Sequence, residues 1–521
     1  MPLSPREKAA GLLVVRLGNN LPPARSADQD ADAVAALLDR HPVGGLILFN
    51  GRWPDTRETL VRLQRHSDAG LLVTTDMERG FGQQALGATV YPHAGAFARL
   101  PDPDAAEAVR TYAEQSSGEA LAGGVHVTYS PVADVDRNPR NPIIGTRAYG
   151  PDPERAAALV TAFVEGVHAA GQIATAKHFP GHGGTSEDSH ATTPSVDDPR
   201  DVLEATDLVP FRAAVAAGVD AVMTAHVAVP ALDPSGAIAT RSAPILRGLL
   251  RDEMGFGGVV VTDSLQMAGA KEAGRTEGDL AAELLLAGVD LFVDAVDPEA
   301  LVEGVGRAVE DGRLDEALLD AALARVQRLR ERLTARFGAG VFRDPGLAYA
   351  SSVVGLPEHR DLAERVARGA VELATGPLPA DLGDGTGVVV VAFRRPPLPI
   401  EPSEMALRSA VAQHLPGATY CELMPSPHSP DADVEAVRSL ARGARRVVLA
   451  PVIRPSAWHA FGLAAREAAL ADEIAATVPT TLLLLGDRRG LAGFPLADSA
   501  LVAYSDVAAS QRALVERLVG A

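Results

Sequence analysis

The hydrophobic positions of the chain fall into short apolar runs that alternate with longer amphipathic stretches. Each run is followed by polar residues and then by a segment with the apolar spacing of a helix. The predicted strands are Gly45–Phe49, Leu71–Thr75, His126–Ala133, Gln172–Ala176, Ala221–Ala225, Val259–Thr262 and Asp290–Val293. The predicted helices between them include Asp104–Gly123, Pro153–Ala170 and Pro199–Ala217. An alternation of strand and helix at this spacing predicts a parallel sheet covered by helices.

Seven predicted strands are one short of a (β/α)8 barrel of the TIM type. We therefore predict a TIM-like barrel over residues 1–345, with the eighth strand near the N-terminus. An open doubly wound sheet is the alternative.

A second alternation follows predicted helices at Leu314–Arg336 and Arg360–Ala374. Its predicted strands are Val388–Phe393, Arg446–Val452, Thr480–Gly486 and Ala500–Tyr504. We predict a helical connector over residues 346–384 and a smaller α/β domain of the sandwich type over residues 385–521.

The charge and composition of the chain narrow the classes of function. The 521 residues carry a net charge of −19, which argues against nucleic acid and anionic membranes because both require clustered Lys and Arg. The single cysteine, Cys421, cannot form an intramolecular disulfide. We see no run long enough for a membrane-spanning helix and no signal peptide, so we expect a cytoplasmic protein.

Polar side chains gather just after the predicted strands. They are Asp76, Glu78, Asp134, Asp136, Lys177, His178, His226 and Asp263. In a barrel the C-terminal ends of all strands converge on one face, where the active site lies. The pattern therefore predicts an active site on that face.

The segment from Lys177 to His190 concentrates titratable groups on a loop that Pro180 and Gly181 keep irregular. Asp188 and His190 lie two residues apart. A carboxylate bonded to one imidazole nitrogen fixes the tautomer and stabilises the imidazolium ion. The pair therefore predicts a general acid/base dyad, with a solvated turn as the alternative.

Asp263 stands at the tip of a very apolar predicted strand, where a carboxylate can act as a nucleophile, a metal ligand or a helix cap. His178 and His182 have the spacing of a zinc-binding helix, but Pro180 lies between them. A metal site on the loop that also uses Asp188 and His190 is the alternative, but we expect no metal and no other cofactor.

Hydrogen-bond donors at the mouth of the barrel suit a ligand rich in hydroxyl groups. Lys177, His178 and Arg147 are such donors, and Asp76 can accept two hydroxyl protons. Paired contacts of this kind are usual for sugars, although phosphate esters also use Lys and Arg. An ion pair of Asp76 with Arg147 or Lys177 is the alternative. We predict a small carbohydrate substrate.

These residues resemble glycoside hydrolase family 3, and more narrowly its β-N-acetylglucosaminidase branch of bacterial cell-wall recycling enzymes. The signature Lys-His-Phe-Pro-Gly-His-Gly followed by Asp-Ser-His occupies residues 177–190, and a strand ends in Val261-Thr-Asp263. Further pieces in family order are Gly44–Phe49, Thr75–Glu78, Tyr129–Asp134, Ile144–Arg147 and Met223–His226. The resemblance spans about residues 5–335, and the second domain matches only loosely.

The resemblance implies a retaining mechanism. Asp263 would attack the anomeric carbon, and His190, oriented by Asp188, would protonate the leaving oxygen and later deprotonate the acceptor. The resemblance also implies that four residues hold the terminal sugar, namely Asp76, Arg147, Lys177 and His178. One departure stands out, because Gln84 occupies the position of a sugar-binding arginine of the family.

We therefore expect an exo-acting β-N-acetylglucosaminidase that acts on muropeptides or chitin-type oligosaccharides. A phosphorylase on the same site is one alternative, because a neutral imidazole does not repel phosphate as a carboxylate would. A β-glucosidase with its acid in the second domain, at Glu401, Glu404 or Glu422, is another. A non-catalytic sugar-binding relative is the third.

Overall fold

The computed structural model describes residues 3–20, 23–189, 192–271, 274–344, 346, 349–396, 406–455 and 461–520. The chain divides into two compact units. The first comprises Met1–Thr89, Ala106–Ile144 and Ala148–His359, and the second comprises Val90–Ala105, Gly145–Arg147 and Arg360–Ala521.

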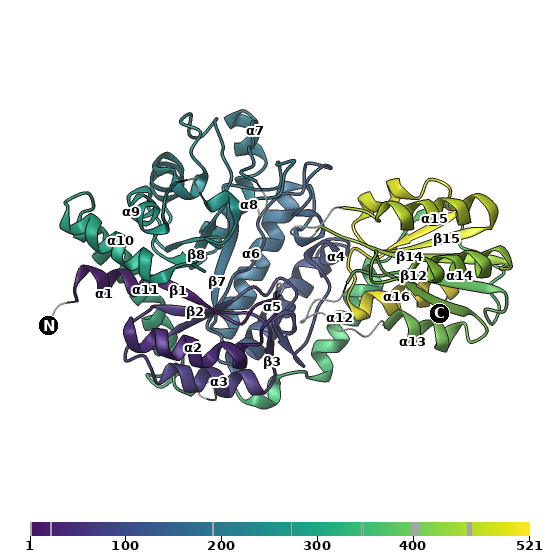
Figure 1. Cartoon of the computed structure of the whole chain (residues 1–521), viewed down its shortest axis with the longest axis horizontal. Helices are drawn as coiled ribbons and strands as arrows, with labels where there is room; N and C mark the ends of the chain where they lie inside the picture. The colour runs from purple at the N-terminus through teal and green to yellow at the C-terminus, as the bar shows by residue number, and fades with distance from the viewer. Residues whose placement is uncertain are drawn as a thin grey trace. The chain divides into compact units, whose positions relative to one another are not determined.

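Eight parallel strands form the barrel of the first unit (Figure 1). They are β1 (Leu13–Leu17), β2 (Gly45–Leu48), β4 (Leu72–Thr75), β6 (Val127–Thr128), β7 (Ile173–Phe179), β8 (Ala221–Thr224), β9 (Val259–Thr262) and β10 (Phe292–Val293). Their order is β10-β1-β2-β4-β6-β7-β8-β9, and a parallel bridge between Val261 and Leu291 joins the two ends. The predicted barrel is confirmed, and its eighth strand is β1.

Helices cover the outside of the barrel. They are α1 (Pro5–Ala10), α2 (Ala27–Arg40), α3 (Asp55–Gln64), α5 (Asp104–Ala122), α6 (Pro153–Ala170), α7 (Arg200–Ala205), α8 (Val209–Ala216), a π-helix (Pro244–Glu253), α9 (Glu277–Ala287), α10 (Pro298–Glu310) and α11 (Glu316–Phe337). The prediction of one continuous helix over Pro199–Ala217 was wrong, because the segment forms two helices, α7 and α8.

Local sequence explains where these helices begin and end. In α6, the side chain of Asp152 accepts bonds from the main-chain N–H groups of Glu154 and Arg155, and Pro153 occupies the first helical position. The helix ends at Gly171, whose φ of 92° is a conformation that favours glycine. The chain then enters β7, which is buried along its whole length.

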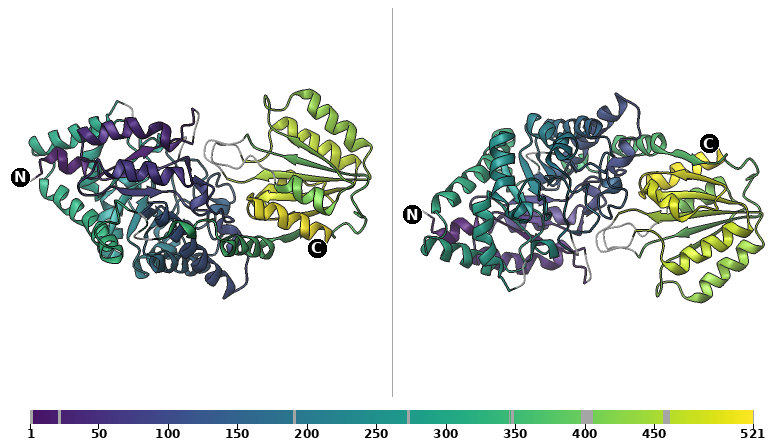
Figure 2. Two further views of the ribbon diagram at one scale, coloured as in Figure 1. Left: turned by 90° about the horizontal axis from the view of Figure 1, so that it is seen from below. Right: turned by 90° about the horizontal axis from the view of Figure 1, so that it is seen from above.

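The second unit is built around a six-stranded sheet (Figure 2). Its strands, in spatial order, are β11 (Glu372–Thr375), β16 (Ser499–Val502), β15 (Thr480–Gly486), β14 (Arg446–Ile453), β12 (Val388–Phe393) and β13 (Thr419–Leu423). Only β11 runs antiparallel to its neighbour. The predicted helix Arg360–Ala374 was wrong at its end, because the helix stops at Ala370 and β11 follows.

Alternate residues of this sheet pack against helices on opposite faces. Val389 and Val391 belong to one hydrophobic core with α14 (Asp431–Arg442) and α15 (Ala465–Thr477). Val388 and Val390 belong to the other core, with α13 (Ala406–His414) and α16 (Ala508–Val519). The remaining helices of the unit are α4 (Ala94–Phe97) and α12 (Pro357–Ala370). The predicted sandwich-type arrangement is therefore confirmed.

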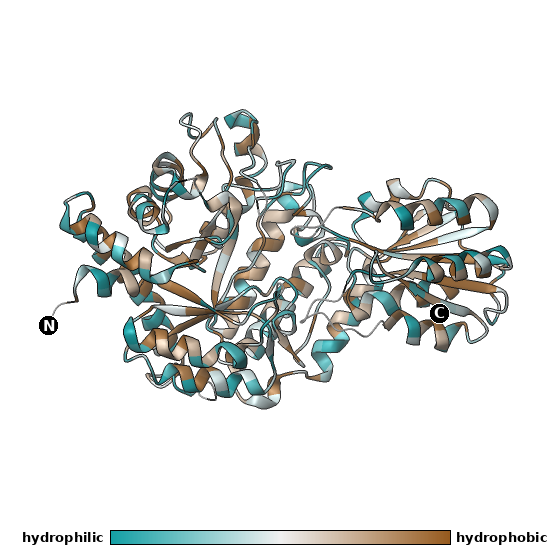
Figure 3. Ribbon diagram, in the orientation of Figure 1, coloured by the Kyte–Doolittle hydropathy of each residue, from teal (hydrophilic) through white to brown (hydrophobic). Residues whose placement is uncertain are grey.

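Hydrophobic residues concentrate on the strands of both units, whereas the outer faces of the helices are hydrophilic (Figure 3). None of the helices in the described ranges has both the length and the apolar character that crossing a membrane requires.

Candidate active site

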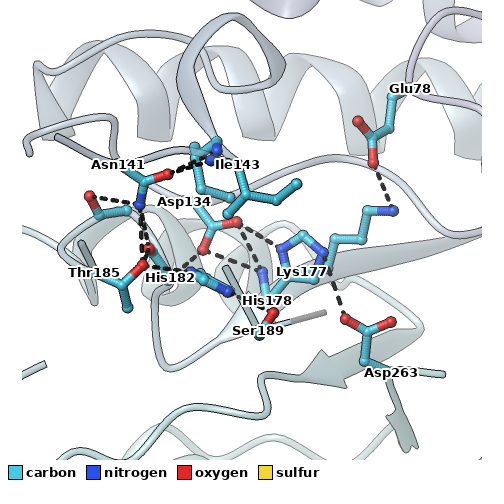
Figure 4. Close-up of polar contacts among 12 residues, drawn as sticks. Glu78, Asp134, Asn141, Ile143, Lys177, His178, His182, Thr185, Ser189 and Asp263 are labelled. Atoms are coloured by element: carbon cyan, nitrogen blue, oxygen red, sulfur yellow. Dashed lines mark hydrogen bonds and ion pairs between the residues drawn. The ribbon is translucent and has the colours of Figure 1, made fainter. Parts of the chain in front are cut away.

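A buried lysine joins two carboxylates at the C-terminal ends of β4 and β7. Nζ of Lys177 lies 2.6 Å from Oδ1 of Asp76. It also lies 2.8 Å from Oε1 of Glu78 (Figure 4). Lys177 is only 2% exposed, whereas the Asp76 side chain keeps 28% of its surface accessible. Asp76 thus forms the ion pair with Lys177 that was expected from the sequence as the alternative to sugar binding. Its side chain is still accessible to a ligand.

His178 is held by a carboxylate that is buried completely. Nδ1 of His178 lies 2.7 Å from Oδ2 of Asp134, and the main-chain N–H of His182 donates to Oδ1 of the same group at 2.7 Å. Burial opposes ionisation of Asp134, but the adjacent His178 and the bonds from both histidines outweigh it and hold the pKa of the carboxyl below its usual range.

Because Asp134 binds Nδ1, the other nitrogen of the His178 ring points towards Asp263 (Figure 4). Nε2 of His178 lies 4.0 Å from Oδ2 of Asp263. Asp263 directly follows β9, and the main-chain N–H of Ser264 donates to its Oδ1 at 2.7 Å. The next α-helix, α9, is capped by Thr276, so Asp263 does not serve as the helix cap considered from the sequence.

The buried phenol of Tyr129, which follows β6, lies near three carboxylates of the barrel mouth. Burial raises the pKa of Tyr129, and the nearby Asp76, Asp294 and Asp263 raise it further. The barrel mouth therefore combines several acidic side chains with the ammonium group of Lys177 and the imidazole of His178.

The loop after β7 is pinned by side-chain amides from the loop after β6. Nδ2 of Asn141 donates to the carbonyl of His182 at 2.9 Å, and Nδ2 of Asn138 donates to that of Thr185 at 2.9 Å. Both ring nitrogens of His182 are engaged, Nδ1 with Oγ1 of Thr185 at 2.9 Å and Nε2 with Oγ of Ser189 at 2.8 Å. His182 therefore shapes the loop that leads to Asp188.

The site roles of two predicted residues, His190 and Arg147, stay predictions. His190 lies outside the described residues, so the Asp188–His190 dyad stays a prediction; Asp188 itself is half-buried, and its carbonyl accepts from the N–H of Thr192 at 3.0 Å. Arg147 ends a short 3-10 helix that belongs to the second compact unit, and its sugar contact also stays a prediction.

Gln84, which replaces an arginine of the resembled family, is buried. Its Oε1 accepts from Nδ2 of Asn20 at 3.0 Å, and its carbonyl accepts from the N–H of Gly51. The side chain of Gln84 thus connects the loop after β4 to the loop after β1.

Sequence reasoning did not single out Glu78 and Asp134 as site residues and missed Arg16 and Asp294 altogether. The first two were visible only as acids after predicted strands. Asp294 also follows a predicted strand directly, which was an available signal, whereas Arg16 lies on the strand that the pattern did not resolve. Across the described ranges, no group of three or more His, Cys, Asp or Glu side chains is arranged to hold a metal ion.

A parallel eight-stranded barrel with acids and donors at the C-terminal ends of its strands defines a class of enzyme scaffold. Comparison with known families narrows the class. The sequence model described as the glycosyl hydrolase family 3 N terminal domain matches residues 5–329. The chain belongs to glycosyl hydrolase family 3, which confirms the resemblance drawn from its motifs.

Individual relatives agree with this assignment. The chain is 31% identical over 380 residues to β-hexosaminidase A of Pseudoalteromonas piscicida, covering 65% of this chain and 60% of that protein. It is 36% identical over 297 residues to a β-hexosaminidase of Xanthomonas oryzae pv. oryzae, covering 55% of this chain and 86% of that protein. The solved structure of a family 3 β-N-acetylglucosaminidase from Paenibacillus sp. superposes with a TM-score of 0.85 at 29% identity, covering 100% of this chain and 97% of that one.

Proposed function

We propose that this protein is a retaining exo-β-N-acetylglucosaminidase. The observation that carries the proposal is the placement of Asp263 at the end of β9, 4.0 Å from a histidine that a buried carboxylate orients. The names of the β-hexosaminidase relatives support the same activity, with similarity extending over 380 and 297 residues.

In the proposed reaction Asp263 attacks the anomeric carbon through its carboxylate and forms a glycosyl-enzyme. The N–H of Ser264 donates to Oδ1, which restrains the rotation of the carboxylate before attack. His190, oriented by Asp188, gives its proton to the leaving oxygen. In the second step the neutral imidazole takes a proton from water, which then displaces Asp263 and retains the anomeric configuration.

The sugar would be held by the residues beside this pair. Lys177 forms an ion pair with Asp76, and the accessible carboxylate of Asp76 can accept sugar hydroxyl protons. His178 and Arg147 complete the proposed contacts. The substrates we propose are muropeptides or short chitin-type oligosaccharides with a terminal N-acetylglucosamine, which would place the enzyme in peptidoglycan recycling.

The β-glucosidase alternative with an acid at Glu422 finds no support. Oε2 of Glu422 accepts from Arg394 at 2.9 Å, and Oε1 accepts from Arg408 at 3.2 Å. Both oxygens are thus committed to arginines. Glu401 and Glu404 lie outside the described residues.

A trapping experiment tests the nucleophile. A fluorinated N-acetylglucosaminyl fluoride that reacts quickly and hydrolyses slowly should leave a covalent adduct on Asp263, located by peptide mass spectrometry. Asp263→Ala should lose turnover and remain unlabelled while keeping its circular dichroism spectrum. An adduct on another carboxylate would overturn the proposal.

A second assay decides the acceptor. Turnover of a nitrophenyl N-acetylglucosaminide should release the free sugar at the same rate with and without phosphate. Formation of the sugar 1-phosphate would instead identify a phosphorylase on the same site.

A further inference from the structure

The loop that follows Asp263 is tied to a second carboxylate, that of Asp294. Asp294 directly follows β10 and is fully buried. Its Oδ2 accepts from Oγ of Ser264 at 2.6 Å, and its Oδ1 accepts from Nε2 of Gln266 at 2.9 Å. Both donors belong to the three residues that come immediately after the proposed nucleophile.

Arg16, from β1, neutralises this buried carboxylate. Its Nε donates to Oδ1 of Asp294 at 2.8 Å, and its Nη2 donates to Oδ2. Nη1 donates to Oδ1 of Asn19 at 2.9 Å, and the guanidinium stacks over the ring of Phe49. A two-pronged pairing of this kind fixes the plane of a carboxylate as well as its charge.

The backbone at Asp294 is also unusual. Its φ of 62° lies in the left-handed region, which is uncommon outside glycine although aspartate tolerates it better than most residues. The N–H of Asp294 donates to the carbonyl of Val14 at 2.9 Å, which anchors this conformation to β1. Such conformations persist where the surroundings enforce them and occur often at functional sites.

Ser264 passes this restraint on to Asp263. Its Oγ is bound by Asp294, its carbonyl accepts from Nε2 of His226 at 3.2 Å, and its N–H donates to Oδ1 of Asp263. The direction of the Ser264 N–H is therefore fixed from both sides of the residue. The same N–H sets the rotation of the Asp263 carboxylate, which leaves Oδ2 facing His178.

We propose that Asp294, paired with Arg16, is a positioning residue for the nucleophilic step. By fixing Ser264 it holds the carboxylate of Asp263 at the angle required for attack on the anomeric carbon. This inference rests on the proposed function, because it assigns Asp294 a role only if Asp263 is the nucleophile.

Asp294→Asn tests the proposal. The amide has one oxygen and an NH2 group where the carboxylate now accepts four bonds, so at least one donor faces another donor. We expect kcat and the rate constant of trapping by the fluorinated donor to fall together by about 100-fold, with KM nearly unchanged. Ser264→Ala, which keeps the N–H, should lose about tenfold, and the double variant should be no worse than Asp294→Asn.

A matched control lies two residues before the same strand. Asp290 is also buried and also paired with two guanidinium groups, Nη2 of Arg251 at 2.6 Å and Nη1 of Arg325 at 2.9 Å. It precedes β10, whereas Asp294 follows the C-terminal end of that strand. Asp290→Asn should lower the melting temperature by loss of a buried ion pair but leave kcat and the trapping rate of the folded enzyme unchanged.

The outcomes separate the two proposals. If the adduct maps to Asp263 but Asp294→Asn is trapped as fast as wild type, or no more slowly than Asp290→Asn, the positioning role is wrong and the proposed function stands. If the adduct maps elsewhere, both fail. Should Asp294→Asn not fold, Arg16→Lys keeps the charge without the fork: a kcat loss of about tenfold supports the role, and unchanged kcat overturns it.

Discussion

Nδ1 of His178 lies 2.7 Å from Oδ2 of the fully buried Asp134, and this contact determines which nitrogen of the ring faces the barrel mouth. The two residues are 44 positions apart, on β7 and on the loop after β6. The pair links a structural requirement, a satisfied buried carboxylate, to a functional one, the direction of Nε2 towards Asp263.

Asp134→Asn should therefore impair both stability and catalysis. Breaking a buried charged pair by removing one partner typically costs about 3 to 5 kcal/mol, and we expect a loss of unfolding free energy near that range. The neutral amide also ceases to orient His178, so KM should rise. Denaturant unfolding and steady-state kinetics measure the two effects, and wild-type values for both would contradict the assignment.

The pH dependence of stability should report the same carboxyl group. The folded-state pKa of Asp134 is lowered, so its ionised form stabilises the protein at pH values above the unfolded-state pKa of about 3.9. This contribution disappears as the pH falls through the lower folded-state value. The difference in melting temperature between wild type and Asp134→Asn should hence be full at neutral pH and shrink below about pH 4. A constant difference across that window would show that the carboxyl does not titrate as inferred.

Asp188 and His190 should behave as one unit. For leaving groups that need protonation, His190→Ala should lose several orders of magnitude in rate, Asp188→Ala somewhat less, and the double variant little more than His190→Ala. With a dinitrophenyl leaving group, glycosylation should persist, deglycosylation should stall, and azide should rescue it as the β-glycosyl azide. An equal loss on every leaving group without azide rescue would exclude His190 as the acid/base.

Turnover should not require a metal ion. The ring nitrogens of His182 are committed to Thr185 and Ser189, and Nδ1 of His178 is committed to Asp134. Exhaustive chelation followed by assay should leave kcat unchanged. Activity that is lost on chelation and restored by zinc or another divalent ion would support the metal site considered from the sequence.

N-acetylglucosaminides should be preferred over glucosides. The expectation comes from the relatives. Gln84, which is buried and replaces a sugar-binding arginine of the family, bears on it because the replacement removes one donor to the sugar hydroxyls. Comparing kcat/KM on the two nitrophenyl glycosides measures the preference, and an equal or higher value for the glucoside would contradict it. Gln84→Arg provides the matched variant for testing whether the replacement alters that ratio.

The barrel was predictable because its strands are local features. A run such as Val259–Thr262 is apolar and bounded by glycines and polar residues, so its state depends little on distant partners. The same local reasoning failed at β11, a four-residue strand at the edge of its sheet that pairs antiparallel with β16. It also failed at β1, which the pattern indicated only as a missing strand.

The sequence by itself determined the family, the barrel, and a set of acids and donors after the strands, since motif order and residue periodicity are read along one dimension. Tertiary structure alone decided which of these groups meet. Lys177 and Asp76 are 101 positions apart, and Arg16 and Asp294 are 278 apart. Pairings of this kind depend on closing β10 against β1 and on the inward direction of each side chain. Local spacing does not encode that geometry, which the packing of the whole barrel enforces.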